Sequence, residues 1–300
     1  MKSEKFSKTI EVVQKEKCCG CHSCYNACPV KAIKMIRDLE GFFYPNVDEE
    51  KCIKCGKCFY KCPHVNPPQI FSLDNAYACY AKDYNEHMSS SSGGVFSLIA
   101  DQVLSEEGIV CGAAFNEDVQ VVHLCITKKS ELLRLKETKY VQSEIGRVYT
   151  EIKMFLELGK VVLFSGTPCQ VAGLKSFLGK EYRNLLCIDL ICHGVPSPAV
   201  WERYLQEIAN GKKVVKMTFR NKEKGILNVT LDYMLENGDI IKERYRDSPY
   251  IKGFASNLYL RPSCHQCDFK GIQRCSDITI GDFWGISEFH PALQSEFGTS

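Results

Sequence analysis

The sequence has few of the features that mark a membrane, secreted or nucleic-acid-binding protein. No apolar run approaches the roughly 18 residues of a transmembrane helix, and the best runs, VVLF (161–164) and LLCIDLIC (185–192), have strand length. The first residues, MKSEKFSKTIEVVQKEK, scatter charges where a signal peptide needs an apolar stretch. Lys and Arg number 38 against 36 Asp and Glu, so no broad basic field indicates nucleic acid. We therefore expect a cytoplasmic protein with no membrane span and no nucleic-acid partner.

Two nucleotide-binding motifs are also missing, whereas cysteine is abundant. Neither G-x-G-x-x-G nor G-x-x-x-x-G-K-[ST] occurs, so a Rossmann nicotinamide site and a P-loop are unsupported. The 300 residues include 18 cysteines. Disulfide frameworks belong to secreted chains, and in a reducing compartment many cysteines indicate metal ligands or redox groups.

One cysteine pattern occurs twice, in a first run (residues 18–28) and a second run (residues 52–62). Each copy reads C-x2-C-x2-C-x3-C-P, the pattern of bacterial ferredoxins, in which the fourth cysteine serves the other cluster. A pair of zinc sites is the alternative, but zinc ribbons use paired C-x2-C knuckles. We predict two [4Fe–4S] clusters, one held by Cys18, Cys21, Cys24 and Cys62 and the other by Cys52, Cys55, Cys58 and Cys28.

A third group of cysteines follows the spacing Cys264-x2-Cys267-x7-Cys275. Three ligands leave a four-coordinate site open, and zinc would accept a histidine as the fourth, whereas a cluster prefers a thiolate. We favour a third [4Fe–4S] cluster completed by Cys192, which ends a predicted strand; the other candidates are Cys169, His193 and His265. We expect the remaining cysteines to be ordinary buried thiols, namely Cys19, Cys79, Cys111, Cys125, Cys187 and whichever of Cys169 and Cys192 is left over.

The rest of the sequence predicts an α/β body after an α+β, ferredoxin-like module. Prolines in PHVNPPQI place the end of that module near 70–76. Strands and helices alternate in the second half, which predicts a mainly parallel sheet with antiparallel additions. The predicted strands are 76–83, 109–115, 121–127, 160–164, 185–192, 214–220 and a hairpin within 229–243 around Asn237-Gly238; the predicted helices are 95–108, 171–178 and 199–209.

Six segments in chain order make the sequence resemble one family. They are the ferredoxin pattern, SSGGVFSLIA (91–100), TKYVQS (138–143), FSGTPCQVAGL (164–174), DLICHGVPSP (189–198), and RPSCHQCDF (261–269) with DITIGDFWG (277–285). The series resembles the coenzyme F420 hydrogenase/dehydrogenase beta-subunit family over essentially the whole chain, with a dicluster ferredoxin domain fused in front. The resemblance implies an iron–sulfur flavoprotein whose FAD exchanges hydride with coenzyme F420.

The resemblance implies a flavin site, and redox chemistry also asks for one. Clusters pass single electrons whereas hydride chemistry moves two, and a flavin converts between them. Serines and glycines before the helix 95–108 would hold a phosphate, with a plain N-cap as the alternative. Lys139 would stabilise the reduced flavin, unless it is an exposed surface lysine. His193 is the candidate proton donor. The expected flavin contacts are Ser90, Ser91, Ser92, Gly93, Gly94, Lys139, Tyr140, Ser143 and Thr167.

We therefore expect three domains, a dicluster ferredoxin domain (1–74), a flavin-contacting domain (75–150) and a C-terminal domain (151–300) truncated at its end. The expected function is an oxidoreductase that passes electrons between the clusters and FAD, and on to coenzyme F420 or another small organic acceptor. The rival is a non-catalytic electron-transfer subunit that connects ferredoxin to a separate catalytic protein. The expected partner is ferredoxin or a hydrogenase/dehydrogenase-type redox protein, and the oligomeric state stays open.

Overall fold

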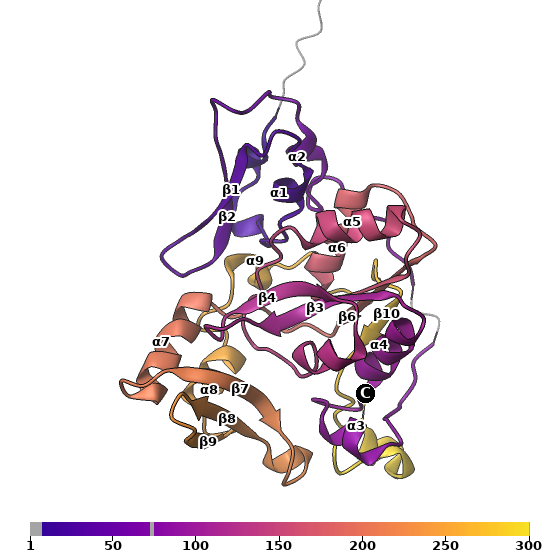
Figure 1. Ribbon diagram of the computed structural model, residues 1–300, viewed down its shortest axis with the longest axis vertical. Coiled ribbons are helices and arrows are strands. Elements are labelled where there is room, and N and C mark those ends of the chain that lie inside the picture. Colours follow the sequence, from indigo (N-terminus) through magenta and orange to yellow (C-terminus); the bar gives the residue numbers. More distant parts are fainter. Residues whose placement is uncertain (1–7, 73–74, 300) are drawn as a thin grey trace, which may run out of the picture.

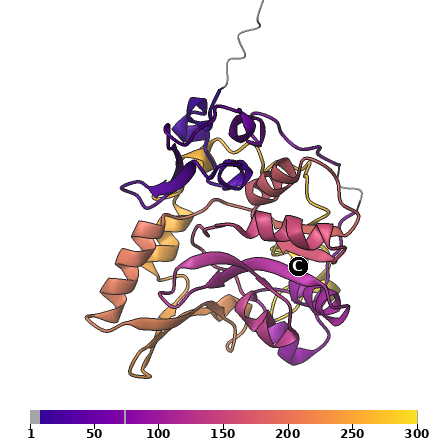
Figure 2. The same ribbon diagram turned by 45° about the horizontal axis from the view of Figure 1, so that its top comes forward.

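The computed structural model describes residues 8–72 and 75–299 (Figure 1). A small cysteine-rich module lies at one end of a larger body, against the helices α5 (Val148–Glu157) and α6 (Pro168–Leu178), in both views (Figures 1 and 2). The predicted domain boundary after residue 74 falls on residues 73–74, outside the described residues. No helix in the described ranges is long and apolar enough to cross a bilayer.

The backbone of the module repeats as its cysteines do. The helices α1 (Ser23–Ala27) and α2 (Lys57–Tyr60) each follow a residue in the left-handed conformation, His22 (φ 61°) and Gly56 (φ 71°). Two residues earlier in each copy, Gly20 (φ 66°) and Lys54 (φ 52°) also have positive φ. The strands β1 (Ile33–Arg37) and β2 (Phe43–Val47) pair antiparallel between the two helices in the chain. The two runs therefore share a loop geometry that wraps the same way around whatever they bind.

A five-stranded sheet forms the centre of the body. Its order is β10-β6-β5-β3-β4, in which β4 is antiparallel and the others run parallel. One face packs on α5 and α6, and the other on α4 (Val95–Ser105), because side chains of a strand alternate between faces. The strands are β3 (Ile109–Phe115), β4 (Val121–Ile126), β5 (Val162–Ser165), β6 (Leu185–Leu190) and β10 (Ile278–Ile280).

A second, antiparallel sheet contains β7 (Val214–Asn221), β8 (Thr230–Leu235) and β9 (Ile240–Arg244). Buried aromatic side chains, including Trp201, Phe219 and Tyr233, pack it against α7 (Pro198–Ala209) and α8 (Pro249–Ala255). The shorter helices are α3 (Tyr84–Met88), α9 (Pro262–His265) and α10 (Ile286–Phe289). The predicted α/β body, with its mainly parallel sheet and antiparallel additions, is thereby confirmed.

Several predicted elements need correction. Residues 76–83 form no strand; Ala81 N–H donates to the Gly93 carbonyl, but no strand pairs with the segment. The helices α5 and α8 went unpredicted. Cys111 and Cys125, expected to be ordinary buried thiols, form a disulfide, because the register of β3 and β4 places them directly opposite each other. Cys79, also expected to be buried, is exposed. The predicted helix 199–209 is confirmed as α7, with the Ser197 side chain as its N-cap and Pro198 at its first turn.

Candidate functional site

The cysteines of the two runs surround two cavities in the module. A cavity of about 480 Å³ is lined by Cys18, Cys21, Cys24 and Cys62. A smaller cavity of about 20 Å³ is lined by Cys28, Cys52, Cys55 and Cys58. These are the two ligand sets predicted from the sequence, including the exchange of the fourth cysteine between the runs. Cys19 also lines the larger cavity. The four thiols of each predicted set are the number of donors that a [4Fe–4S] cluster requires.

Burial and neighbouring thiols raise the pKa of Cys24 beside the larger cavity. Burial raises the pKa of Cys24 well above its usual range, and Cys18 and Cys62 raise it further. Neighbouring thiols therefore resist ionisation together, and a bound iron cluster would supply the positive charge that offsets this resistance.

A buried arginine supports the first run. The Arg261 guanidinium donates from Nε to the Cys18 carbonyl (2.7 Å) and from Nη2 to the Phe43 carbonyl (2.9 Å), and Nη2 also approaches Cys18 Sγ (3.7 Å). Its Nη1 donates to Gln142 Oε1 (2.9 Å), and Gln142 Nε2 donates to the Cys19 carbonyl. A full positive charge thus lies beside the larger cavity, where it would favour the more negative state of a cluster.

The helix α6 approaches the first run at a glycine. A Cβ on Gly173 would lie 2.6 Å from Cys21 Cβ and 2.8 Å from Cys21 Sγ, closer than real Cβ contacts. Any larger residue would push the loop away from the helix. The larger cavity is therefore built jointly by the module and the body.

A third group of thiols lies beside the first run. Each pair among its four members interacts electrostatically; the group consists of Cys169, Cys192, Cys264 and Cys267. Burial and these neighbours raise the pKa of Cys264 to about 11. Backbone N–H groups of Val195 and Phe269 donate to Cys264 Sγ and Cys267 Sγ, both at 3.4 Å, a contact that also tunes cluster-bound thiolates.

The structure does not bring Cys275 to this group. Cys275 is buried in the core between the sheet and α6, and its charged neighbours are Lys175, Asp189 and Asp277. Cys275 stands shortly before β10, which pairs with β6 in the central sheet. Cys169, one of the candidates for the fourth ligand, therefore joins Cys192 in the group. Over residues 8–72 and 75–299, no three Cys, His, Asp or Glu side chains are placed to hold a single metal ion.

Cys19 connects the first run to the third group. Its thiol is buried and hydrogen-bonds the Cys169 thiol. Cys169 also contacts Thr167 Oγ1 at 3.2 Å, at the start of α6. The larger cavity and the third group are thus in contact through Cys19 and Cys169.

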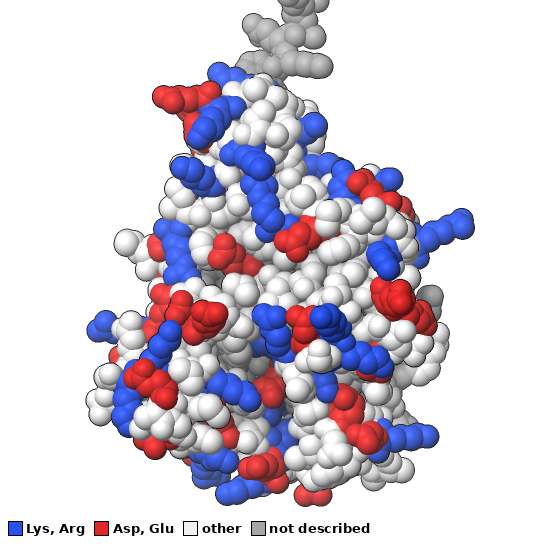
Figure 3. Space-filling model, in the orientation of Figure 1, with Lys and Arg blue, Asp and Glu red and all other residues white. Residues whose placement is uncertain are grey.

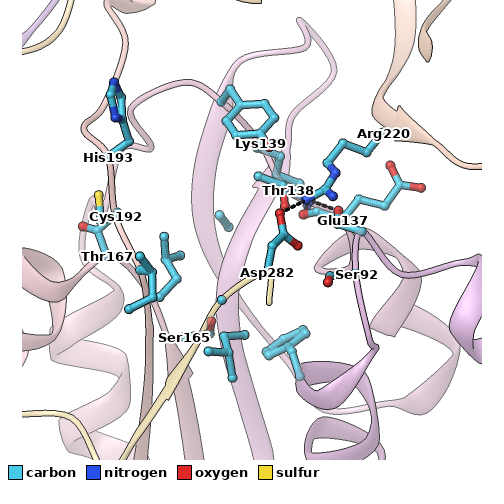
Figure 4. A pocket seen from close by; sticks show the side chains of 18 of the residues that line it. Ser92, Glu137, Thr138, Lys139, Ser165, Thr167, Cys192, His193, Arg220 and Asp282 are labelled. Atoms are coloured by element: carbon cyan, nitrogen blue, oxygen red, sulfur yellow. Dashed lines mark hydrogen bonds and ion pairs between the residues drawn. The ribbon is translucent and has the colours of Figure 1, made fainter. Parts of the chain in front are cut away.

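A pocket of about 570 Å³ lies beyond the third group, at the ends of β5, β6 and β10. Parallel sheets place ligands at the carboxyl ends of their strands. Cys192 and His193 lie on one side of the pocket and Lys139, Arg220 and Asp282 on the other (Figure 4). Apart from Gly93, every residue predicted to contact the flavin lines this pocket, namely Ser90, Ser91, Ser92, Gly94, Lys139, Tyr140, Ser143 and Thr167.

The serine hydroxyls at the pocket are bonded to the protein. Ser90 Oγ donates to the Glu86 carbonyl (2.9 Å), Ser91 Oγ accepts from Thr138 N–H (2.6 Å), and Ser92 Oγ donates to the Thr299 carbonyl (3.2 Å). These bonds shape the loop before α4. The first N–H groups of α4 have no partner within the helix and remain the natural contacts for an anion.

Two lysines in this region have lowered pKa values. Lys139 Nζ donates to the carbonyls of Lys136 (2.6 Å) and Glu137 (3.1 Å), and burial lowers its pKa to about 8. Lys139 lines the pocket from a segment without helix, so it is not an exposed lysine on a helix. Lys222 is buried and donates to the carbonyls of His87, Ser92 and Phe297; burial lowers its pKa to about 8 as well.

The comparisons with known proteins agree with this geometry. Residues 159–300 match the family described as the C terminus of the coenzyme F420 hydrogenase/dehydrogenase beta subunit. This part of the chain is similar to that family. Residues 17–66 match the 4Fe-4S dicluster domain. The resemblance seen in the sequence is therefore confirmed, and the two domains together indicate a redox protein that transfers electrons through iron–sulfur clusters.

A solved structure is also similar, from the F420-reducing [NiFe] hydrogenase complex of Methanosarcina barkeri studied by xenon derivatisation. The match is 18% identical, has a TM-score of 0.43, and covers 63% of this chain and 64% of that chain. No curated protein matches the chain.

Sequence reasoning missed several residues at these sites. Arg261 stands three residues before Cys264, but a single arginine carries no signal of its own. His123 lines the pocket from β4; its Nε2 lies 3.1 Å from the Ser165 carbonyl, and burial lowers its pKa to about 4. Arg220 and Asp282 form a 2.8 Å ion pair in the pocket wall although 62 positions separate them in sequence. Pairing at such a separation can be seen only once the chain is folded.

Proposed function

We propose that the chain is an iron–sulfur flavoprotein oxidoreductase that passes electrons between [4Fe–4S] clusters and FAD, and on to coenzyme F420 or another small organic acceptor. The continuity of the candidate sites carries this proposal. Cys19 of the first run bonds Cys169 of the third group, and Cys192 of that group also lines the pocket. Electron transfer between centres requires such short separations. Surplus cysteines placed by chance would have no reason to lie this close together.

In this proposal residues 1–74 form a dicluster ferredoxin domain with the crossed ligand sets described above. A third [4Fe–4S] cluster is held by Cys169, Cys192, Cys264 and Cys267. Buried thiols near one another, with backbone N–H groups aimed at two of them, support a cluster here. The partner that supplies or takes electrons is a ferredoxin or a hydrogenase-type redox protein.

The pocket is proposed to hold the flavin between residues 75–150 and 151–300. Its volume is within the range of cofactor sites, and apolar side chains such as Ile191 and Trp284 line it beside the polar ones. When bound, a flavin supplies the conversion between one-electron and two-electron transfer. Lys139 and Arg220 place positive charge in the pocket wall, where negative charge on a reduced ring would be stabilised. His193 is the proposed proton donor, from the side that carries Cys192.

The test is anaerobic purification followed by measurement of iron, sulfide and flavin per chain. Three cubes require about twelve irons per chain, and the flavin should appear as a yellow chromophore. Cys169→Ala should lower the iron content to about eight, whereas Cys275→Ala should leave it at the wild-type value. Lys139→Met should slow flavin reduction without loss of iron. Clusters without flavin would support the electron-transfer subunit instead, and zinc without iron or sulfide would contradict both.

A further inference from the structure

The two cysteine runs differ in charge although their spacing is the same. The first run, CCGCHSCYNAC, contains no Lys, Arg, Asp or Glu, whereas the second, CIKCGKCFYKC, contains Lys54, Lys57 and Lys61 and no acid. A lysine thus stands in every interval between the ligands of the second run. The chemistry of the cluster requires none of them, because the first run has none.

The two runs also differ in exposure. Cys19, Cys21 and Cys24 are buried, whereas Cys55 is the exposed member of the second run. Ile53 and Tyr60 beside it have 62% and 63% of their surfaces exposed. Apolar side chains of this size at the surface, surrounded by charge, are typical of protein contact sites.

The exposed residues of the second run lie together around the smaller cavity. Ile53, Lys54 and Cys55 all line that cavity, and the Tyr60 ring lies 3.3 Å from where a Cβ on Gly56 would be. Lys8 adds a further charge, with its Nζ 5.7 Å from the centre of the Phe59 ring. Figure 3 shows basic side chains at this end of the molecule, with a group of acidic side chains beside some of them. We call this surface the lysine face; it consists of Lys8, Ile53, Lys54, Lys57 and Tyr60.

The lysines of this face have no acidic partners in the described parts of the chain. None of the ion pairs there includes Lys8, Lys54 or Lys57, whereas Lys51, just before the run, pairs with Asp48 at 2.9 Å. On the body, Lys129 likewise pairs with Asp101 at 2.8 Å. An unneutralised group of lysines around an exposed ligand is therefore available to an external negative charge.

We propose that the lysine face docks an acidic one-electron carrier protein. The proposal deepens the proposed function and rests on it, since the carrier exchanges electrons with the cluster assigned to the second run. One electron leaves the reduced carrier, which is oxidised, and reduces that cluster; no bond forms or breaks and no proton moves. The charge of the lysines steers the encounter, and Ile53 and Tyr60 supply the apolar centre of the contact.

The probe is a purified acidic [4Fe–4S] ferredoxin, and the test compares two double variants with equal changes of charge. Lys54→Glu/Lys57→Glu reverses two charges in the face. Lys128→Glu/Lys224→Glu reverses two exposed lysines of the body that, in the described structure, also form no ion pair. Binding of the oxidised carrier is measured by calorimetry at low salt, and its oxidation after reduction is followed by stopped flow.

The face variant should react with the carrier about tenfold more slowly than wild type, with weaker binding and a flatter dependence on salt. The body variant should behave as wild type. Methyl viologen radical, a small cation, should reduce both variants at least as fast as wild type, which shows that their clusters are intact. Equal rates and affinities for the carrier in all three proteins would overturn the proposal.

Failure of this inference can be told from failure of the proposed function. A protein that contains no iron and sulfide lacks the clusters, and both then fail. A protein whose clusters accept electrons from viologen but whose lysines do not affect the carrier loses only the docking proposal. Dimerisation of wild type, or binding of an RNA oligonucleotide, that the face variant abolishes while carrier kinetics stay unchanged would also overturn it.

Discussion

The first run lies on the side of the module that contacts the body, where α6, Arg261 and Gln142 surround it. The second run instead has exposed lysines at the surface of the module. Both copies have the same cysteine spacing and the same two left-handed positions. Where the first copy has buried His22 as the left-handed residue before its helix, the second has Gly56. The two copies thus share the cysteine spacing and the loop conformation, and they differ in the contacts that each loop makes with the rest of the protein.

This difference bears on electron flow. Reduction potentials depend on burial, nearby charge and hydrogen bonds to the sulfurs. The first run has a buried guanidinium beside Cys18 and the third group beside Cys19. The second run has solvent and free lysines. Identical ligand sets would therefore give two unequal centres, the inner one connected to the pocket and the outer one open to a partner.

The largest expected effect comes from removing Arg261, whose guanidinium donates hydrogen bonds to the first run and to β2. Arg261→Met removes a buried charge and leaves the carbonyls of Cys18 and Phe43 without their donor. We expect a loss of about 3–5 kcal/mol in the free energy of unfolding and a lower potential for the inner cluster. Denaturant unfolding and EPR-monitored redox titration measure the two effects. Arg244→Met, at an exposed ion pair, is the control and should change stability by less than about 1 kcal/mol; an equal loss in both variants would contradict the assignment.

A somewhat smaller effect is expected where α6 meets the loop. Gly173→Leu places side-chain atoms where Cys21 lies, although leucine favours a helix more than glycine does. We expect a cost of about 1–3 kcal/mol and a loss of iron from the first cluster alone. The control is Gly271→Leu, since the nearest atom to a Cβ there is 4.0 Å away on an exposed turn. Iron analysis that shows full occupancy in Gly173→Leu would mean that the two parts do not touch as described.

Buried His123 lies close enough to His22 of the first run for a positive charge on it to lower the pKa of His22. Burial lowers the pKa of His123 to about 4, below its unfolded value of about 6.5. Its contribution to stability is therefore present above pH 6.5 and is lost as the pH falls toward 4. Between pH 7 and 5 wild type should lose about 2 kcal/mol more than His123→Gln. Urea unfolding of both proteins at the two pH values measures this, and parallel losses would refute it.

The smallest expected effects come from replacing the non-glycine residues at the left-handed positions of the two runs, Lys54 and His22, by glycine. Lys54 is exposed and has φ 52°, a conformation that costs a residue with a Cβ but not glycine. Lys54→Gly should stabilise the folded chain by less than about 1 kcal/mol after the entropy of glycine is counted. His22→Gly should instead destabilise it, because the buried ring packs edge-on against Tyr25 and Phe43. Thermal unfolding of the two variants compares them; a stabilised His22→Gly would show that the ring is dispensable.

Local patterns predicted much of this molecule. Cysteine spacing predicted which four thiols line each cavity of the module, because the repeated pattern is that of ferredoxins, in which the fourth cysteine serves the other cluster. The strands of the central sheet were recognisable as short apolar segments, and Ser197-Pro198 marked the start of α7. The predicted strand 76–83 was wrong, because an apolar segment becomes a strand only when a neighbouring strand pairs with it.

The parts that escaped prediction depend on distant contacts. Cys169 and Cys275 are both plausible ligands in the sequence, and only the path of the chain after Cys267 separates them. Arg261 reaches Cys18 across 243 positions, and the Cys111–Cys125 bond depends on the register of two strands. Such contacts are set by tertiary packing, which a single sequence does not display.

The central claim is that three clusters are held by three cysteine groups, with the first run in the middle. Anomalous X-ray scattering of iron from crystals grown anaerobically tests it most directly. The account predicts three cubes, one between Cys18, Cys21, Cys24 and Cys62, one between Cys28, Cys52, Cys55 and Cys58, and one between Cys169, Cys192, Cys264 and Cys267. Iron bound to Cys275 in place of Cys169, or a cube held entirely within one run, would contradict it.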